Sequence, residues 1–444
     1  MTIPQLQYVL LMVLPLPLFY VAVIKRHFVY FLPPFLSLLG IYVYNIIGSH
    51  HVLNDPVLYS EKYFYTLLSI IFLYYPFYAV IFLLGKKVKI DWRETLDENE
   101  NINLLFVACL WAISFYFVNL YIQRHGLPPI FSLTSSLEYV DIYALRAEKA
   151  TSLTEGSHWY NMGFYTVPSF IFIYTYVLYS LHQTRKYKYL FYSSIPLIIL
   201  MFFSFLGKGG IIYLLCYFIT IKLLVKYHEV KSSHVKYYIV IGMASIILIL
   251  RLYLLDRSFY DVLALLPHYM FERICLTYTD GYAIMLNIFP LKHDYFYGVA
   301  FGNPGHVFPF EPVDLSQFLG MFLHGGLENY SVPAYAQGYA NFGVAGIYMI
   351  VLLMFMQMLI VQVFFKSLRR NPIFLSVYIY IVVRMIDYAK EPIQGIIAEE
   401  YILFALFVCA VYYLIRDVYK KFCSAFGSKA YVTQKSPRLD NLKV

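Results

Sequence analysis

The stretch from Gln337 to Phe365 reads QGYANFGVAGIYMIVLLMFMQMLIVQVFF and contains no Asp, Glu, Lys or Arg. A helix rises about 1.5 Å per residue, so about 20 apolar residues cross a hydrocarbon core of about 30 Å. Similar runs recur along nearly the whole chain, which is 60% hydrophobic, 20% aromatic and only 14% charged, with a mean hydropathy of +0.62. Soluble domains carry about 25% charged residues, and the composition therefore predicts an integral membrane protein.

The apolar runs predict an all-α, polytopic fold with about eleven transmembrane helices. The first run has no basic segment before it and no small-residue cleavage site after it, so we expect a membrane span there and not a removed signal peptide. The predicted spans are 6–24, 28–47, 62–84, 104–122, 162–181, 189–206, 210–226, 237–255, 337–365, 373–389 and 399–415.

The segments that join these spans lie alternately on the two sides of the membrane, and the two sets differ in their content of Lys and Arg. One set is rich in Lys and Arg, which are enriched in cytoplasmic loops, and comprises 25–27, 85–101, 182–188, 226–236, 366–371 and the tail after 416. The N-terminus is then outside, toward the periplasm or the cell exterior, and the C-terminus is cytoplasmic. Two long segments, about 123–161 and 256–336, face outward. We expect one transmembrane domain over 1–420 and a cytoplasmic tail over 421–444, whose polar end is predicted to be disordered.

A lysine among glycines stands between two predicted spans, in the stretch FSFLGKGGIIYLL that covers 203–215. A hairpin here must turn within about three residues, and glycine permits the positive φ angles of such a turn. Lys208 would then stand at the outer rim, beside a helix N-terminus whose free N–H groups favour an anion. The two open interpretations are a phosphate-binding turn and a plain turn whose lysine reaches the headgroups.

Other cations also fall on the predicted outer side, where the charge rule does not explain them. Arginine presents its donors in a planar fork that matches two phosphate oxygens, so several arginines facing one cavity would suit a pyrophosphate. Arg384 also lies three residues before Asp387 on one helix face, where the two can pair. The candidate pyrophosphate-binding residues are Arg124, Arg146, Lys208, Arg273 and Arg384.

The outer segment 256–336 holds the candidates for a general base, and a helix is expected over 258–290. A base for a sugar hydroxyl must be a carboxylate or an imidazole within hydrogen-bond reach of that oxygen. The candidates are Asp280, Glu311, His324 and Glu328, with His306 and Asp314 as further possibilities. The alternative for each of them is a solvated loop residue.

Several common motifs are absent from the sequence. It has no GxxxxGK[ST] phosphate loop, no G-x-S-x-G elbow, no HExxH, and no Asp-x-Asp pair in the first outer loop, 48–61. The five cysteines show no spacing typical of a metal site or a disulfide framework. We therefore expect neither a metal nor a cofactor.

The chain resembles the Wzy-type O-antigen polymerases, which join oligosaccharide repeat units at bacterial inner membranes. Four short motifs and the arginine-bearing segment 123–161 carry the resemblance, which spans most of the chain. One departure is Lys208, where an arginine is more typical. The motifs are YNIIGS (44–49), the Gly-Lys-Gly-Gly turn (207–210), ERICLTYTDGY (272–282) and ENYSVPAYAQGYANFGVAG (328–346).

The resemblance implies an inverting, metal-independent glycosyltransferase of the GT-C type at the periplasmic face of the inner membrane. Its substrates would be undecaprenyl-pyrophosphate-linked oligosaccharides. Its partners would be the lipid bilayer and a chain-length-regulating membrane protein, and no nucleic acid is expected. Two alternatives stay open: an O-antigen ligase, which shares the donor and the outward loop, and a lipid-linked oligosaccharide flippase.

Overall fold

The computed structural model is mainly helical over the residues that it describes, which are 3–24, 28–85, 100–132, 158–205, 209–225, 259–301, 303, 309–324, 330–368, 371–391 and 402–425. Within those ranges it forms no β-strand. The chain divides into two compact units. The first comprises Met1–Lys89, Met243–Ser367 and Tyr378–Ile402, and the second comprises Ile90–Gly242, Leu368–Val377 and Leu403–Val444.

Eight of the described helical segments are long and apolar enough to cross a membrane, in agreement with a multi-pass membrane protein. They match eight of the eleven predicted spans and are Ile3–Ala22, Phe31–Asn54, Glu61–Leu84, Glu100–His125, Trp159–His182, Ala334–Phe364, Pro372–Ala389 and Ile402–Ser424. Helices also form at two further predicted spans, α10 (Arg185–Phe203) and α11 (Gly209–Val225). The remaining predicted span, 237–255, lies outside the described residues.

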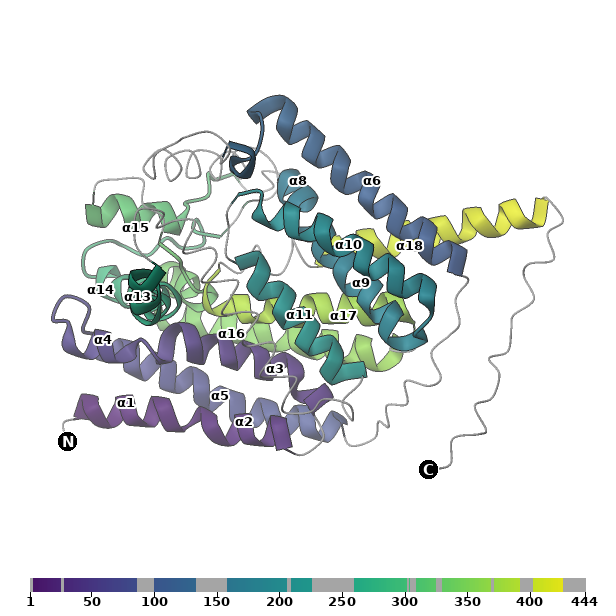
Figure 1. Ribbon diagram of the computed structural model, residues 1–444. Coiled ribbons are helices and arrows are strands. Elements are labelled where there is room, and N and C mark those ends of the chain that lie inside the picture. Colours follow the sequence, from purple (N-terminus) through teal and green to yellow (C-terminus); the bar gives the residue numbers. More distant parts are fainter. Residues whose placement is uncertain are drawn as a thin grey trace. The chain divides into compact units, whose positions relative to one another are not determined.

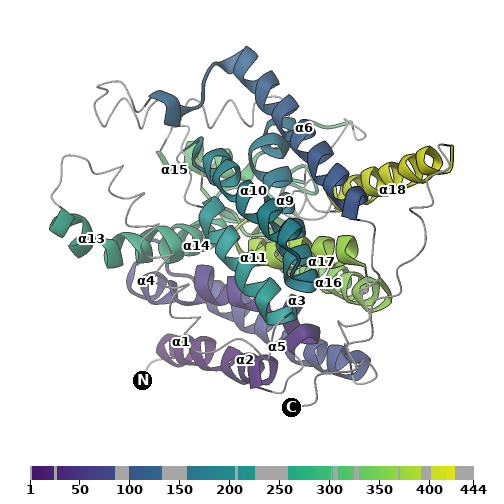
Figure 2. The ribbon, with the colours of Figure 1, turned by 45° about the vertical axis from the view of Figure 1, so that its right-hand side comes forward.

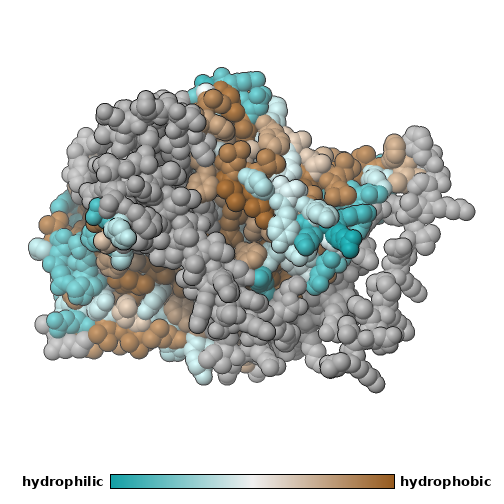
Figure 3. All heavy atoms as spheres, viewed as in Figure 1, coloured by the Kyte–Doolittle hydropathy of each residue, from teal (hydrophilic) through white to brown (hydrophobic). Residues whose placement is uncertain are grey.

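The first unit begins with α1 (Ile3–Val13) and α2 (Pro15–Ile24), which lie beside α5 (Glu61–Gly85) in both Figure 1 and Figure 2. Hydrophobic side chains cover the outer surface of α1, seen in brown along the lower edge of Figure 3. Ile3 is 71% exposed and Val13 is 51% exposed. A large apolar surface of this kind is not stable in water, so it indicates contact with lipid.

Between α2 and α5 the chain forms α3 (Phe28–Ile41), a π-helix η1 (Tyr42–Ile46) and α4 (Ser49–Asn54). A second π-helix, η6 (Glu272–Leu276), joins α13 (Phe259–Phe271) to α14 (Thr277–Ile288), and η1 packs against η6. The helix that the sequence predicted over 258–290 is therefore confirmed, with a π-helical interruption at its centre.

The longest helix, α16 (Ala334–Leu368), is broken near its start. Phe342 leaves the helical region and Gly343 adopts a φ of +62°, which favours glycine. At this break Gly346 lies directly against the carbonyl oxygen of Gly338, where no side chain fits. The break is stabilised by the Asn341 carboxamide, which accepts hydrogen bonds from the N–H groups of Gly298 (2.8 Å) and Ala300 (3.2 Å).

The first unit also contains α15 (Leu315–His324), part of α17 (Pro372–Arg384) and the 3-10 helix η8 (Met385–Ala389). Asp314 caps α15, because its Oδ1 accepts the N–H of Ser316 at 2.8 Å. The segment η8 packs closely on α3, where a side chain at Gly40 would meet the Ile386 carbonyl oxygen at 2.5 Å.

The second unit is built around α9 (Val167–His182), most of whose side chains are buried. It also contains α6 (Glu100–His125), η3 (Pro129–Ser132), α8 (His158–Asn161), the π-helix η4 (Met162–Thr166), α10, α11 and α18 (Ile402–Ala425). The buried Asn103 ties three helices together, because it accepts from the Tyr174 hydroxyl and donates to the Tyr187 hydroxyl, both at 2.8 Å.

Candidate functional site

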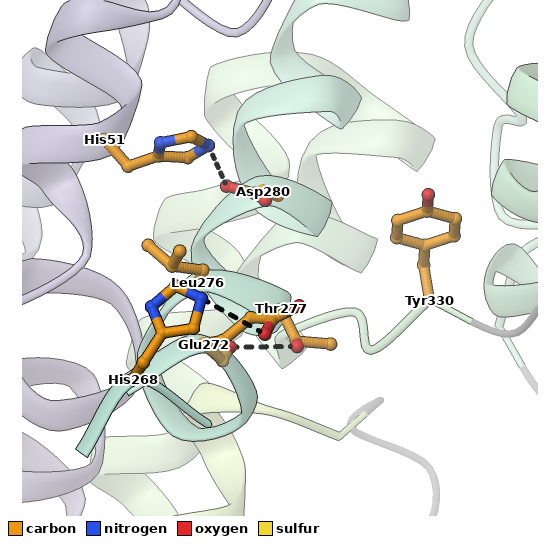
Figure 4. A pocket seen from close by; sticks show the side chains of 7 residues that line it. All are labelled: His51, His268, Glu272, Leu276, Thr277, Asp280 and Tyr330. Carbon is orange, nitrogen blue, oxygen red and sulfur yellow. Dashed lines mark hydrogen bonds and ion pairs between the residues drawn. The ribbon is translucent and has the colours of Figure 1, made fainter. Parts of the chain in front are cut away.

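A pocket of about 410 Å³ lies in the first unit (Figure 4). Its lining combines two imidazoles, two carboxylates, two hydroxyl groups and one aliphatic side chain. The lining residues are His51, His268, Glu272, Leu276, Thr277, Asp280 and Tyr330. The pocket thus holds two imidazoles and two carboxylates, the side chains that most often transfer protons in catalysis.

His51 from α4 and Asp280 from α14 point toward each other across the pocket (Figure 4), with 3.9 Å between His51 Nε2 and Asp280 Oδ1. The two helices approach closely because Gly48 has no side chain. A Cβ at Gly48 would overlap the Thr279 hydroxyl. The same hydroxyl donates to the Tyr44 carbonyl oxygen at 3.1 Å, which fixes α14 against η1 one residue before Asp280.

A backbone carbonyl oxygen of the π-helix η1 accepts the hydrogen bonds that hold α4 against α14. In a π-helix the backbone bonds run from residue i+5 to residue i, as Ile47 does to Tyr42. The Asn45 carbonyl oxygen accepts hydroxyl hydrogen bonds from Ser49 at 3.0 Å, from Thr279 at 3.5 Å and from Tyr63. Three parts of the first unit, α4, α5 and α14, therefore meet at one backbone carbonyl.

Burial changes the chemistry of the Asp280 carboxyl. Its side chain is 25% exposed, and its Oδ1 atom is buried without a hydrogen bond from the described residues. Burial raises the pKa of Asp280 from 3.8 to about 6, His51 acts to lower that pKa, and Asp55 acts to raise it. A carboxyl with this pKa is mostly ionised at neutral pH and still accepts a proton readily, which suits a general base.

A second imidazole–carboxylate pair lies on the other side of the pocket. His268 and Glu272 stand one helical turn apart, with 4.0 Å between Nε2 and Oε2. Both side chains are more than half exposed, so their attraction is screened by solvent. The Thr277 hydroxyl donates to the Glu272 carbonyl oxygen at 3.1 Å across the π-helix. This pair forms the solvent-facing rim of the pocket.

The structure separates Asp280 from the other predicted bases. Asp280 lines the pocket, whereas Glu311 is exposed and lies outside the pocket lining. His324 ends α15, but its side chain lies outside the described residues, as does all of Glu328. Asp280 is therefore the predicted base that the described residues place in a pocket.

The predicted pyrophosphate ligands lie in several places. Arg124, near the C-terminus of α6, donates to the Tyr160 hydroxyl at 3.3 Å in the second unit. Arg273 belongs to η6, but its side chain lies outside the described residues. Arg146 and Lys208 also lie outside the described residues, so those two assignments stay predictions.

Arg384 lies within a buried ionic cluster of the first unit. It approaches Asp387 at 3.4 Å, which confirms the predicted pair, and Lys390 approaches the same carboxylate at 3.1 Å. The Asp387 side chain is fully buried, and both cations are largely buried. Asn45 links this cluster to η1, because its side-chain amide donates to the Ala389 carbonyl oxygen at 3.0 Å.

His51 and Glu272 were not predicted as pocket residues. His51 follows the YNIIGS motif by two residues, and Glu272 stands four residues after His268, a helical spacing that brings the two side chains together. These two spacings are the features of the sequence that could have indicated His51 and Glu272 as pocket residues. The pairing of His51 with Asp280 joins residues far apart in the chain and could not be read from local spacing.

Comparisons of the chain with protein families, with curated proteins and with solved structures found no match. The resemblance to repeat-unit polymerases therefore stays a hypothesis. The chemistry of the pocket is the basis of the functional assignment.

The raised pKa of Asp280 predicts how stability depends on pH. The folded chain holds this proton more tightly than the unfolded chain, so the stabilisation is complete below about pH 4 and is lost as the pH rises through about 6. Asp280→Asn cannot ionise, so relative to wild type it is expected to gain stability as the pH rises from about 4 to about 8. Thermal unfolding in detergent across this range measures the difference. A difference that is the same at every pH would contradict the prediction.

The shared carboxylate of the ionic cluster predicts a large loss of stability on mutation. Asp387→Asn removes the negative charge that Arg384 and Lys390 both approach in a buried site, and we expect a loss of about 3 kcal/mol. Glu100→Gln is the matched control, because Glu100 pairs with Lys186 at 2.7 Å on the surface, where such pairs contribute below about 1 kcal/mol. Equal losses in the two variants, measured by thermal unfolding, would contradict this account.

Proposed function

We propose that this protein polymerises undecaprenyl-pyrophosphate-linked oligosaccharide repeat units at the periplasmic face of a bacterial inner membrane. The reaction is an inverting glycosyl transfer in which the growing chain leaves its lipid pyrophosphate and joins a hydroxyl of the incoming lipid-linked repeat. The observation that carries the proposal is the half-buried Asp280 carboxylate, which faces His51 in a pocket of a helical membrane protein.

Asp280 is the general base in this proposal. It takes the proton of the acceptor hydroxyl as that oxygen forms a bond to the anomeric carbon of the donor, while the bond from that carbon to the pyrophosphate oxygen breaks. Such a step contributes about 10²- to 10⁴-fold to the rate when the base stands within about 3 Å of the hydroxyl. His51 supports the step because an imidazole beside the carboxylate favours its ionised form.

Cations stabilise the departing pyrophosphate, which carries the developing negative charge. The residues proposed for this role are Arg124, Arg146, Lys208 and Arg273, with Arg384 nearby. Arg384 already shares the Asp387 carboxylate with Lys390. We assign Arg384 to a position near the lipid carrier's pyrophosphate without direct contact. The other four residues are assigned to direct contact with the phosphate oxygens.

The proposed topology follows the distribution of charge along the chain. Eleven spans place the N-terminus in the periplasm and the C-terminus in the cytoplasm, and the two long segments face outward. This arrangement puts α14 and the Asp280 pocket on the periplasmic side, where lipid-linked repeat units are available after they have crossed the membrane.

A lipopolysaccharide gel tests the proposed activity. A deletion strain is expected to carry a single repeat on the lipid A core in place of the polymer ladder, and the wild-type gene is expected to restore the ladder. Arg146→Ala and Arg273→Ala are expected to fail in this complementation. An unchanged ladder in both variants would reject the phosphate assignment, and a core without any repeat in the deletion strain would indicate a ligase or a flippase.

A further inference from the structure

An exposed apolar patch in the first unit is not explained by the proposed activity. It consists of Val57, Leu291, Tyr297, Met321 and Phe322, whose exposed fractions are 78%, 77%, 73%, 61% and 41%. Four of these side chains belong to α15 and to the segment 289–297, which meet in an aromatic cluster. In it Phe318 of α15 packs against Phe289 (6.0 Å), His293 (5.1 Å) and Phe296 (5.2 Å). We call this surface the outer apolar patch.

The backbone beneath the patch is held rigidly. The N–H groups of Phe296 and Tyr297 donate to the carbonyl oxygens of Ala340 (2.9 Å) and Asn341 (3.1 Å) at the break in α16. The Asn287 side chain also donates to the Val57 carbonyl oxygen at 3.1 Å. The apolar side chains therefore project from a fixed surface.

Tyr297 adopts a φ of +50°, a left-handed conformation that costs a residue other than glycine free energy. The next residue, Gly298, has a φ of +105°, so the chain uses glycine at one left-handed position and tyrosine at the other. A strained residue whose side chain is 73% exposed gains little from internal packing. Backbone strain clusters at functional sites, so it favours a role for the Tyr297 side chain beyond the fold.

The position of the patch indicates that it lies at the level of the lipid headgroups. The helix α15 has ten residues, about 15 Å in length, and is too short to cross a bilayer, while it buries Leu315 and Leu319 and exposes Met321 and Phe322. The adjoining segment is hydrogen-bonded to the first turns of α16, a candidate membrane span. Tyrosine, together with a lysine beside an exposed leucine, as at Lys292 and Leu291, is typical of the level of the lipid headgroups.

We propose that the outer apolar patch inserts into the headgroup and upper acyl region of the bilayer and fixes α15 and the segment 289–301 at the membrane surface. The proposal does not depend on the polymerase activity.

Fluorescence quenching in nanodiscs tests the proposal on the full chain. The three native tryptophans are replaced by phenylalanine, and single tryptophans are introduced as Leu291→Trp, Tyr297→Trp and Met321→Trp. Phosphatidylcholine brominated at acyl carbons 6 and 7 is expected to quench each of them at least twofold more than Glu311→Trp, an exposed residue outside the patch. Iodide in the aqueous phase is expected to show the reverse order. Strong quenching by iodide with weak quenching by bromolipid at the three patch sites would overturn the proposal and indicate a glycan or protein partner.

A second variant separates membrane contact from folding. Tyr297→Gly keeps the left-handed backbone without strain, so its thermal stability in detergent is expected to equal or exceed that of the wild type. A marked loss of stability would show that the tyrosine side chain serves the fold, and this would also overturn the proposal.

Discussion

Asp280→Asn is expected to reduce polymer formation by at least about 100-fold, because the amide cannot take the proton of the acceptor hydroxyl. On a lipopolysaccharide gel the ladder should collapse to a single-repeat band while the protein stays folded. The amide has nearly the shape of the carboxyl, and removal of a buried charge stabilises the fold at neutral pH. Loss of activity with unchanged or increased stability separates a catalytic effect from misfolding.

Asp314→Asn is the matched control for this experiment. Asp314 caps α15 through the Ser316 N–H, lies outside the pocket lining and is exposed. Asparagine caps helices about as well as aspartate, so the ladder should be unchanged. A normal ladder in Asp280→Asn would reject Asp280 as the base, and a collapsed ladder in Asp314→Asn would show that the assay responds to any change in this segment.

His51 should affect the pH at which the base works. Since His51 acts to lower the pKa of Asp280, its loss is expected to raise that pKa further above about 6. His51→Gln is therefore expected to move the acidic limb of the pH–activity profile upward and to keep part of the activity at about pH 8.

Gly346→Leu is expected to cause a large loss of stability. A Cβ at this position would overlap the carbonyl oxygen of Gly338, and backbone atoms on both sides of the contact cannot move aside as a flexible side chain would. Overpacking of a core costs about 1–3 kcal/mol when neighbours can shift, and a larger cost is expected at this contact. The membrane yield of the variant and its thermal unfolding in detergent measure this effect.

Gly126→Ala is the control that isolates backbone conformation from contact. Gly126 has a φ of +77° at the end of α6, but no atom lies within 4 Å of the position where its Cβ would stand. A left-handed residue other than glycine costs about 1–2 kcal/mol. If Gly346→Leu were no more harmful than Gly126→Ala, the close approach of the two halves of α16 would be wrong.

The membrane character of the fold could be predicted from the sequence because a bilayer demands long apolar runs. Eight predicted spans coincide with long apolar helices, and the Arg384–Asp387 pair followed from helical spacing. The interruptions of those helices could not be predicted in this way. The π-helix at Tyr42–Ile46 is nearly as apolar as the segments around it, and the one at Glu272–Leu276 carries two charged residues that an α-helix could hold as well, so hydropathy reveals neither interruption.

The pocket was only partly predictable for a related reason. Asp280 was recognised as one of several carboxylates in an outward segment, but its environment depends on the contact of α14 with η1 and α4. That contact depends on Gly48, which admits the Thr279 hydroxyl, and on the Asn45 carbonyl oxygen, which receives it. Both are backbone features that a reading of side chains along the sequence does not detect.

The π-helix at Tyr42–Ile46 also sets the rotational phase of everything that follows it. A π-helix holds about one residue more per turn than an α-helix does, so the five residues of η1 turn the chain about as far as four α-helical residues would. Each residue turns an α-helix by about 100°, so if the same five residues formed a regular α-helix, α4 would present His51 about 100° away from Asp280. The wider π-helical turn within an apolar helix therefore decides whether the imidazole and the carboxylate face each other.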